Sequence, residues 1–385
     1  MQPLVMCENG GCLAKVGGSE LTRLIGELFG DFSPEDSSLF TIDGTKMLFN
    51  LDFGPLVGDD PCNAGKIAAH HAISDIYVSA GTPKYASIML QIAEDITFGQ
   101  TKAILAGIKE VCESENIGIL GGHTIRSDTS VVGLSVIGTA NEAYLNRSKK
   151  QCAMGDKIMI SKKLGSGIAT RAYFHKIIGK EAYAEATESM LTSNSVALKA
   201  FSAVHVHACT DVTGFGLLGH LSEMLSAEHG AAIYEDRIRV FDCIAQLQPG
   251  AFFTRFIEDN INYVLRSKKC EIEFDTIERL ALVDPQTNGP VMLTVDPTDV
   301  EELEKLGFYV IPSKANFVFC YHDAISSAEL CAKLKEEGIL TRHFADEKLD
   351  KYLRITIGTE QEMAVVLITI KEILAEVMYD ACANF

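Results

Sequence analysis

The chain of 385 residues lacks any continuous apolar stretch of the roughly 18 residues that a membrane-spanning helix requires. Its first residues also lack a basic segment followed by an apolar core, which is the pattern typical of a secretory leader. Because neither kind of segment is present, the sequence predicts a cytoplasmic protein with no membrane partner.

Positive charge is scarce, because 34 lysine and arginine residues stand against 52 aspartate and glutamate residues, for a formal net charge of −18. Such a chain repels nucleic acid, so phosphorylated ligands must be gathered by local cations, metal ions and backbone N–H groups. The 11 cysteines include no Cys-x-x-Cys pair. This spacing favours reduced thiols over a disulfide framework or a zinc site.

The composition that is present, 47% hydrophobic and 22% charged residues, is typical of a globular protein, and the length is sufficient for two or three domains. Strand-like and helix-like segments are mixed as in an α+β fold. A polar, basic stretch at 146–151 and a change of composition near residue 306 indicate junctions. We therefore expect domains at 1–150 and 151–305, followed by a C-terminal segment at 306–385.

The most informative segment is 210–220, which reads Thr-Asp-Val-Thr-Gly-Phe-Gly-Leu-Leu-Gly-His. Asp211 stands at the entrance of a turn in which Gly214 and Gly216 permit positive φ and a close approach to a ligand. The N–H groups of the following helix favour anions, and a carboxylate can hold a hard cation such as Mg²⁺. The alternative is an ordinary helix start with Asp211 or Thr213 as the N-cap.

Three further aspartates, Asp36, Asp52 and Asp75, are placed where backbone elements end or turn. Taken singly, an aspartate at such a place more often caps a helix or faces solvent. Asp75 is the exception, because it lies in an apolar helix-like segment where an unpaired carboxylate is costly to bury. Several carboxylates together suit phosphoryl transfer, which depends on Mg²⁺ ions held on a polyphosphate.

Cys12 and Lys15 lie three residues apart in the glycine-rich segment Gly-Gly-Cys-Leu-Ala-Lys. A nearby lysine favours the thiolate form of a cysteine, and the thiolate is the nucleophile. The alternative is that Cys12 is an ordinary structural thiol.

Residues 210–220 resemble, almost letter for letter, the signature of the selenophosphate synthetase family, whose superfamily includes aminoimidazole ribonucleotide (AIR) synthetase. The resemblance covers about residues 8–297. The other matching segments are 59–61, 68–77, 121–124, 164–167 and 284–287. It implies a two-domain AIR synthetase-like fold, a homodimer, and the reaction of ATP, selenide and water to selenophosphate, AMP and phosphate.

The same resemblance implies roles for individual residues. Asp36, Asp75 and Asp211 match magnesium ligands of the family, with K⁺ as a further candidate ion. Cys12 matches the residue that handles selenide, and Lys15 matches a lysine at the ATP phosphates. The remaining matches to the nucleotide site are Asp52, Gly121, Gly122, His123 and Thr124. Without the other matching residues, a histidine such as His123 would more often be structural than catalytic.

The chain departs from the family pattern at three places. The second cysteine of Cys-x-Cys-Lys is absent, Phe53-Gly54-Pro55 replaces Phe-Phe-Thr-Pro, and Asn288-Gly289-Pro290 replaces Ser-Gly-Gly. The metal carboxylates are retained, so binding of ATP and Mg²⁺ follows more directly than the identity of the acceptor. Two alternatives therefore stay open: a phosphotransferase that forms ADP with another acceptor, and a non-catalytic nucleotide-binding protein with a ligand-sensing tail.

From about residue 306, the segments at 312–317, 338–342 and 352–359 resemble the small C-terminal domain of histidinol-phosphate aminotransferase and its pyridoxal-phosphate (PLP) relatives. The resemblance implies a small α/β sandwich, with Arg354 at a substrate carboxylate, Arg342 near a phosphate, and hence a tail anion site. No lysine in 1–305 lies in the cofactor motif, so PLP is not expected. A sensing module, a packing element and a fusion without selected function remain open.

Overall fold

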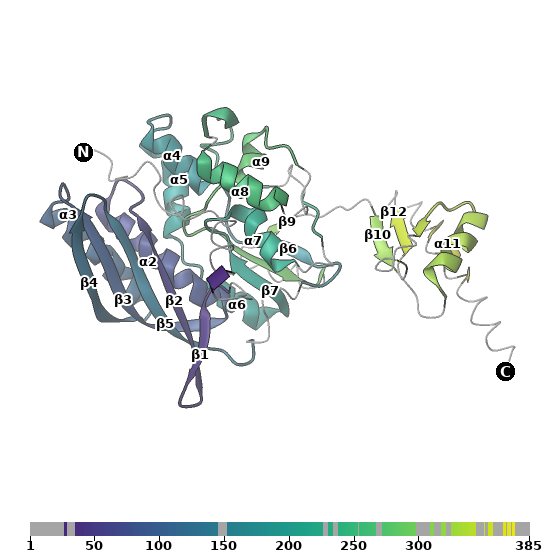
Figure 1. The fold of residues 1–385 in the computed structure, drawn as a ribbon, viewed down its shortest axis with the longest axis horizontal. Coiled ribbons are helices and arrows are strands. Elements are labelled where there is room, and N and C mark those ends of the chain that lie inside the picture. The colour runs from purple at the N-terminus through teal and green to yellow at the C-terminus, as the bar shows by residue number, and fades with distance from the viewer. Residues whose placement is uncertain are drawn as a thin grey trace. The chain divides into compact units, whose positions relative to one another are not determined.

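The computed structural model describes residues 27–28, 35–144, 152–225, 230–233, 238–252, 254–266, 272–297, 309–311, 317–320, 325–343, 350, 353–356, 365–366, 368–370 and 372–373. The chain divides into two compact units, Met1–Pro312 and Ser313–Phe385 (Figure 1). No helix in these described ranges is long and apolar enough to cross a membrane.

The first part of unit Met1–Pro312 is built on a five-stranded sheet with the order β1-β2-β5-β3-β4 (Figure 1). Its strands are β1 Ser38–Ile42, β2 Thr45–Pro55, β3 Gly81–Ala93, β4 Gly118–Ser127 and β5 Val131–Ala140. All neighbouring strands are antiparallel except β3 and β4, which are parallel. Asp43-Gly44 is a pair typical of tight turns, which predicts a hairpin between the strand-like runs 39–42 and 46–52. In the structure this pair joins β1 to β2, with φ of 49° at Asp43 and 80° at Gly44. The predicted hairpin is therefore confirmed.

Two helices, α2 Pro61–Val78 and α3 Phe98–Ser114, pack together, and α2 lies against strands β2 and β5. Helix α2 begins where Asp60 accepts a hydrogen bond from the Asn63 N–H, with proline at the first helical position. A Cβ atom added at Gly65 would come within 2.0 Å of the Ile104 carbonyl oxygen. Glycine there permits the close crossing of α2 and α3 that holds α2 in place.

The second part of this unit contains an antiparallel four-stranded sheet with the order β7-β8-β6-β9. Its strands are β6 Lys157–Ile160, β7 Val206–Asp211, β8 Val291–Val295 and β9 Tyr309–Ile311. Strand β9 thus lies after the expected junction at 305. The accompanying helices are α4 Ser166–Phe174, α5 Lys180–Leu191, α6 Val196–Ala203, α7 Gly216–Met224, α8 Arg255–Arg266, α9 Ile277–Ala281 and the short 3-10 helix η3 Pro249–Phe252.

The sequence pattern predicts one long helix over about 181–201, and the structure shows that this prediction is wrong. Helix α5 ends at Leu191, Thr192 takes an extended conformation with φ of −83° and ψ of 128°, and α6 begins at Val196. The break places Asn194 in the protein interior, where it is 1% exposed and its side chain makes tertiary hydrogen bonds. The run Thr192-Ser193-Asn194-Ser195 also disfavours a helix interior, because these side chains compete for backbone hydrogen bonds.

Unit Ser313–Phe385 contains a three-stranded antiparallel sheet with the order β10-β12-β11. The strands are β10 Phe317–Cys320, β11 Arg342–His343 and β12 Leu353–Thr356, accompanied by α11 Ser327–Glu336. Ser326 caps α11 by accepting a hydrogen bond from the Glu329 N–H. Its buried apolar residues include Ile325, Leu330, Leu334, Leu353 and Ile355.

Candidate metal centre

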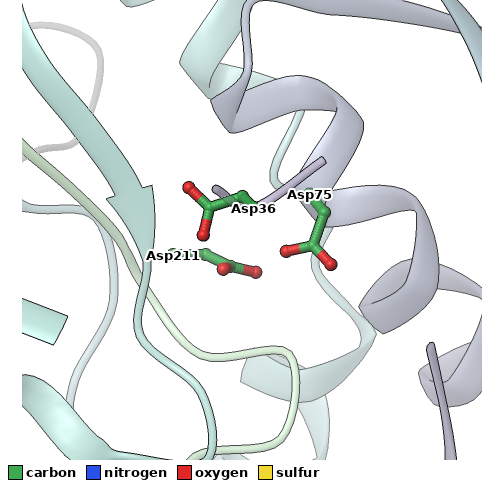
Figure 2. A group of neighbouring side chains, drawn as sticks. All are labelled: Asp36, Asp75 and Asp211. Atoms are coloured by element: carbon green, nitrogen blue, oxygen red, sulfur yellow. The ribbon is translucent and has the colours of Figure 1, made fainter. Parts of the chain in front are cut away.

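Three of the predicted aspartates come together in unit Met1–Pro312. Asp36 precedes β1, Asp75 lies in the last turns of α2, and Asp211 ends β7. One carboxylate oxygen from each lies within 4.8 Å of the others, and Figure 2 shows the three side chains converging. Three like charges this close repel one another unless a cation lies among them. Oxygen ligands of this kind suit a hard divalent cation such as Mg²⁺.

Asp211 gives the strongest indication of a cation. Its side chain is 1% exposed, and its Oδ2 atom accepts a hydrogen bond of 2.5 Å from the Ser74 hydroxyl. Within the described residues, its Oδ1 atom is buried with no hydrogen-bond partner. A buried carboxylate oxygen without a donor is costly. The residues present therefore fit a metal ion at this place.

The alternative of an ordinary cap at Asp211 or Thr213 is not what the structure shows. Helix α7 has Phe215 at its N-cap and no side-chain cap hydrogen bond. The Thr213 hydroxyl instead lies 3.2 Å from His220 Nε2. Because Asp211 does not cap α7, its carboxylate can take part in binding a cation.

The glycines of this turn behave differently from each other. Gly216 has φ of 68°, and a Cβ atom there would lie 2.7 Å from the Val283 carbonyl carbon, so both conformation and space require glycine. The positive φ expected at Gly214 is absent. The Gly214 carbonyl accepts a hydrogen bond of 2.9 Å from Asn260 Nδ2, which ties the turn to α8.

Asp52 is held by a histidine that sequence reasoning missed. Asp52 Oδ2 lies 3.0 Å from His71 Nε2, and both side chains are about nine-tenths buried. His71 Nδ1 accepts a hydrogen bond of 3.2 Å from the Asn288 N–H, so Nε2 carries the proton and donates it to Asp52. His71 is four residues before Asp75 on the same helix face. Its presence in the matching segment 68–77 was the available signal.

Asn288, one of the departures from the family pattern, connects several loops. It has φ of 44°, a left-handed conformation that asparagine tolerates better than most residues. Its Nδ2 donates to the carbonyls of Met190 at 2.6 Å and Thr192 at 2.9 Å. Its own carbonyl accepts a bond of 2.9 Å from Lys162 Nζ. Asn288 therefore ties the break after α5 to Lys162, in the segment that follows strand β6.

Lys162 is a buried cation that sequence reasoning also missed. Its Nζ atom donates to the Thr192 carbonyl at 2.8 Å as well as to Asn288. Burial lowers the pKa of this ammonium to about 7, and the negative charge of Asp211 opposes the shift. The charge of Lys162 therefore changes with pH near neutrality, and it acts on Asp211, a member of the acidic cluster formed by Asp36, Asp75 and Asp211.

At the start of helix α4, where residues 164–167 match the family, the backbone N–H groups donate hydrogen bonds to side chains of the protein itself. Gln286 Oε1 accepts hydrogen bonds of 3.0 Å from the N–H groups of Gly165 and Ser166. Asp284 Oδ2 accepts from the N–H groups of Gly167 at 3.0 Å and Ile168 at 3.1 Å. The matching segments 164–167 and 284–287 therefore form one capping arrangement.

The other predicted site residues are placed as follows. Gly121, Gly122, His123 and Thr124 lie in β4, the exposed edge strand opposite β1. Cys12 and Lys15 lie outside the described residues. Arg342 is an exposed residue of β11, and its paired position in β12 is Arg354.

Solved structures with a similar fold include thiamine monophosphate kinase from Aquifex aeolicus, with a TM-score of 0.53 and 17% identity over 72% of this chain and 88% of that one. Another is the hydrogenase maturation protein HypE in complex with ATP, with a TM-score of 0.52 and 16% identity over 77% of this chain and 87% of that one. At these identities the likeness concerns the fold alone.

Family models agree with this fold. Residues 29–140 match the AIR synthase related protein N-terminal domain, residues 153–306 the C-terminal domain, and residues 299–370 aminotransferase class I and II. Fold and acidic cluster together define a two-domain AIR synthase-related protein with an aminotransferase-like C-terminal segment.

Curated relatives narrow the class. Selenide, water dikinase of Clostridium botulinum strain Alaska E43 is 31% identical over 311 residues, which are 77% of this chain and 89% of that protein. The same enzyme of Agathobacter rectalis is 33% identical over 314 residues, 78% and 91% of the two chains. The chain belongs to the selenide, water dikinase family, the selenophosphate synthetases. The expected family and fold class are confirmed.

Proposed function

We propose that the protein converts ATP, selenide and water to selenophosphate, AMP and phosphate. The observation that carries this proposal is the convergence of Asp36, Asp75 and Asp211 in a chain whose curated relatives are selenide, water dikinases. The proposal takes ATP and selenide, the substrates of the family, as the substrates of this protein.

In this proposal Asp36, Asp75 and Asp211 hold Mg²⁺, which when bound supplies charge neutralisation on the polyphosphate. Lys15 stabilises charge that develops on the phosphates, and Cys12 delivers or shields selenium. Asp52 and residues 121–124 contact the nucleotide, with K⁺ as a further ion and no PLP. Free cysteines such as Cys112 and Cys152 are consistent with a reducing, cytoplasmic location.

Phosphorus NMR of the purified protein with ATP, Mg²⁺ and K⁺, with and without selenide under anaerobic reducing conditions, tests the reaction. We expect a selenophosphate signal and an equal amount of AMP only when selenide is present. Formation of ADP without selenophosphate would favour a phosphotransferase with another acceptor. Unchanged ATP in both samples would favour a nucleotide-binding protein without turnover.

We further propose that the protein is a homodimer formed through the open face of the five-stranded sheet. Along β2, Leu48, Asn50 and Asp52 are buried on the side of α2, whereas Leu51 and Phe53 alternate with them and are 45% and 53% exposed. By strand register, the exposed apolar residues Ile42, Tyr85 and Ile125 share this face with Leu51 and Phe53. An exposed apolar sheet face of this kind supports association with a second copy.

Light scattering with size-exclusion chromatography tests the dimer. The unchanged protein is expected at twice the chain mass of 41.9 kDa, and Phe53→Glu at the single-chain mass. Phe98→Glu is the control, because Phe98 is 85% exposed but begins helix α3. A Phe53→Glu protein that stays dimeric would contradict this assignment of the interface.

A tail anion site at Arg342 and Arg354 is a second proposal. The two residues occupy directly paired positions of β11 and β12. Guanidinium groups bind carboxylate and phosphate through paired hydrogen bonds, so two arginines at paired positions suit an anion.

Inorganic phosphate is expected to raise the melting temperature of the tail unit in the full-length protein. Arg342→Gln and Arg354→Gln should each abolish the increase, because both positions are needed. Differential scanning calorimetry, with Lys333→Gln as the control for loss of one positive charge, provides the measurement. An increase that persists in both arginine variants would contradict the proposal.

A further inference from the structure

Ser74 links the acidic cluster to the break between helices α5 and α6. It lies on α2, is 0% exposed, and donates its hydroxyl proton to Asp211 Oδ2 at 2.5 Å. The same hydroxyl oxygen accepts a hydrogen bond of 2.8 Å from Asn194 Nδ2. Because an amide nitrogen only donates, the single hydroxyl proton of Ser74 is committed to Asp211.

Asn194 is itself held in one orientation. Its Nδ2 also donates to the Gly289 carbonyl at 3.0 Å, so a flipped amide would bring two acceptor oxygens together. Asn194 is 1% exposed, and no local helix constrains it, because it lies between α5 and α6. Its position is therefore set by Gly289 and Ser74, and the chain of bonds runs in one direction, from Asn194 through Ser74 to Asp211.

This chain of bonds accounts for the two different oxygens of Asp211. Oδ2 receives the Ser74 proton, while Oδ1 is buried without a partner among the described residues. A carboxylate anchored by one oxygen cannot rotate freely, so the other oxygen stays available for a cation. Hydrogen bonds to ligating carboxylates commonly have this orienting effect.

We infer that Ser74 and Asn194 are positioning residues for the metal ion of this enzyme. They orient Asp211, and they act only when the two domains are docked, since Ser74 comes from the N-terminal domain and Asn194 and Asp211 come from the second. The inference rests on the proposed function, because it assumes a divalent ion at the three aspartates.

Manganese binding, followed by the electron paramagnetic resonance signal of free Mn²⁺ with and without a non-hydrolysable ATP analogue, tests this inference. Ser74→Ala is expected to weaken Mn²⁺ binding by about 10-fold to 100-fold, as is usual when a ligand loses its orienting partner. Turnover should recover largely at saturating Mg²⁺, because the three ligands themselves are retained. A purely structural defect would not produce this separation of metal affinity from maximal rate.

The matched control is Thr170→Val. Thr170 is buried and its hydroxyl lies 2.9 Å from the Tyr183 hydroxyl, so this variant also loses one buried side-chain hydrogen bond. It should leave Mn²⁺ affinity unchanged. Asn194→Ala should weaken binding less than Ser74→Ala, and the double variant should match Ser74→Ala alone, because Asn194 acts through Ser74.

Failure of the inference and failure of the proposed site give different results. If Asp75→Asn and Asp211→Asn leave Mn²⁺ affinity unchanged, the ion does not bind at the aspartates. The proposed metal site and the positioning role of Ser74 and Asn194 are then both overturned. If these variants weaken binding while Ser74→Ala retains the affinity of the unchanged protein, the metal site stands and the positioning role is overturned.

Discussion

Asp211→Asn is expected to lower selenide-dependent AMP formation by about 1000-fold, which corresponds to roughly 4 kcal/mol of transition-state stabilisation. The variant keeps the size of the side chain, and its amide oxygen can accept the Ser74 proton in place of Oδ2. The amide nitrogen then replaces the oxygen that has no partner among the described residues, and an N–H donor cannot bind a cation. Anaerobic assays of AMP at saturating ATP and selenide provide the measurement.

Asp156→Asn is the control for this prediction. Asp156 is a partly buried aspartate whose side chain is 8% exposed, but its carboxylate contacts His207 Nδ1 at 2.8 Å and is not part of the acidic cluster. Its replacement should change the rate by no more than a few fold. If Asp211→Asn retained more than a tenth of the unchanged rate, Asp211 would have no essential metal-binding role.

The second large effect concerns the stability of the second domain. Asp284→Ala is expected to lower the free energy of unfolding by about 3–5 kcal/mol. The side chain is 0% exposed and its Oδ2 accepts hydrogen bonds from the N–H groups of Gly167 and Ile168 and from Gln286 Nε2. Removing the carboxylate leaves these buried donors unsatisfied. Equilibrium denaturation at pH 7 measures the change.

Asp284→Asn separates the cap from its charge. Burial raises the pKa of Asp284 from 3.8 to about 7, although its three hydrogen-bond donors oppose the shift. The stability associated with the neutral acid is therefore fully present below pH 3.8 and is lost as the pH rises toward 7. Relative to Asp284→Asn, which keeps an acceptor oxygen and has no charge, the unchanged protein should lose roughly 3–4 kcal/mol between pH 4 and pH 7. If the stabilities of the two proteins changed in parallel with pH, the pKa of the Asp284 carboxyl would not be raised in the folded protein.

Local sequence patterns predicted those features in which neighbouring residues control the backbone. The Asp43-Gly44 turn was predictable because both residues tolerate positive φ, and they take it. The helix prediction failed over 181–201, because it passed over Thr192-Ser193-Asn194-Ser195, residue types that favour caps and turns. The helix breaks because Asn194 makes buried hydrogen bonds with Ser74 and Gly289, residues about 120 and 95 positions away, and no local pattern records them.

The acidic cluster shows the same division. Asp36, Asp75 and Asp211 could be selected from the sequence by their motifs, but Ser74, Asn194, His71 and Lys162 could not be assigned a place around them. Residues 164–167 and 284–287 were likewise separate matches until the structure showed that Asp284 and Gln286 cap α4. A motif indicates which residue types are present, whereas a hydrogen bond also requires that two distant segments fold to within about 3 Å.

By itself the sequence determined the family, the acidic character of the chain, the three aspartates and the resemblance of the tail to an aminotransferase domain, since these depend on residue identity and spacing. The tertiary structure alone decided that the aspartates lie within 4.8 Å of one another. It alone decided that one oxygen of Asp211 is satisfied across 137 residues by Ser74 while the other is buried without a described partner. The physical reason is that burial and hydrogen bonding are properties of the packed chain, which arise only when the two domains dock.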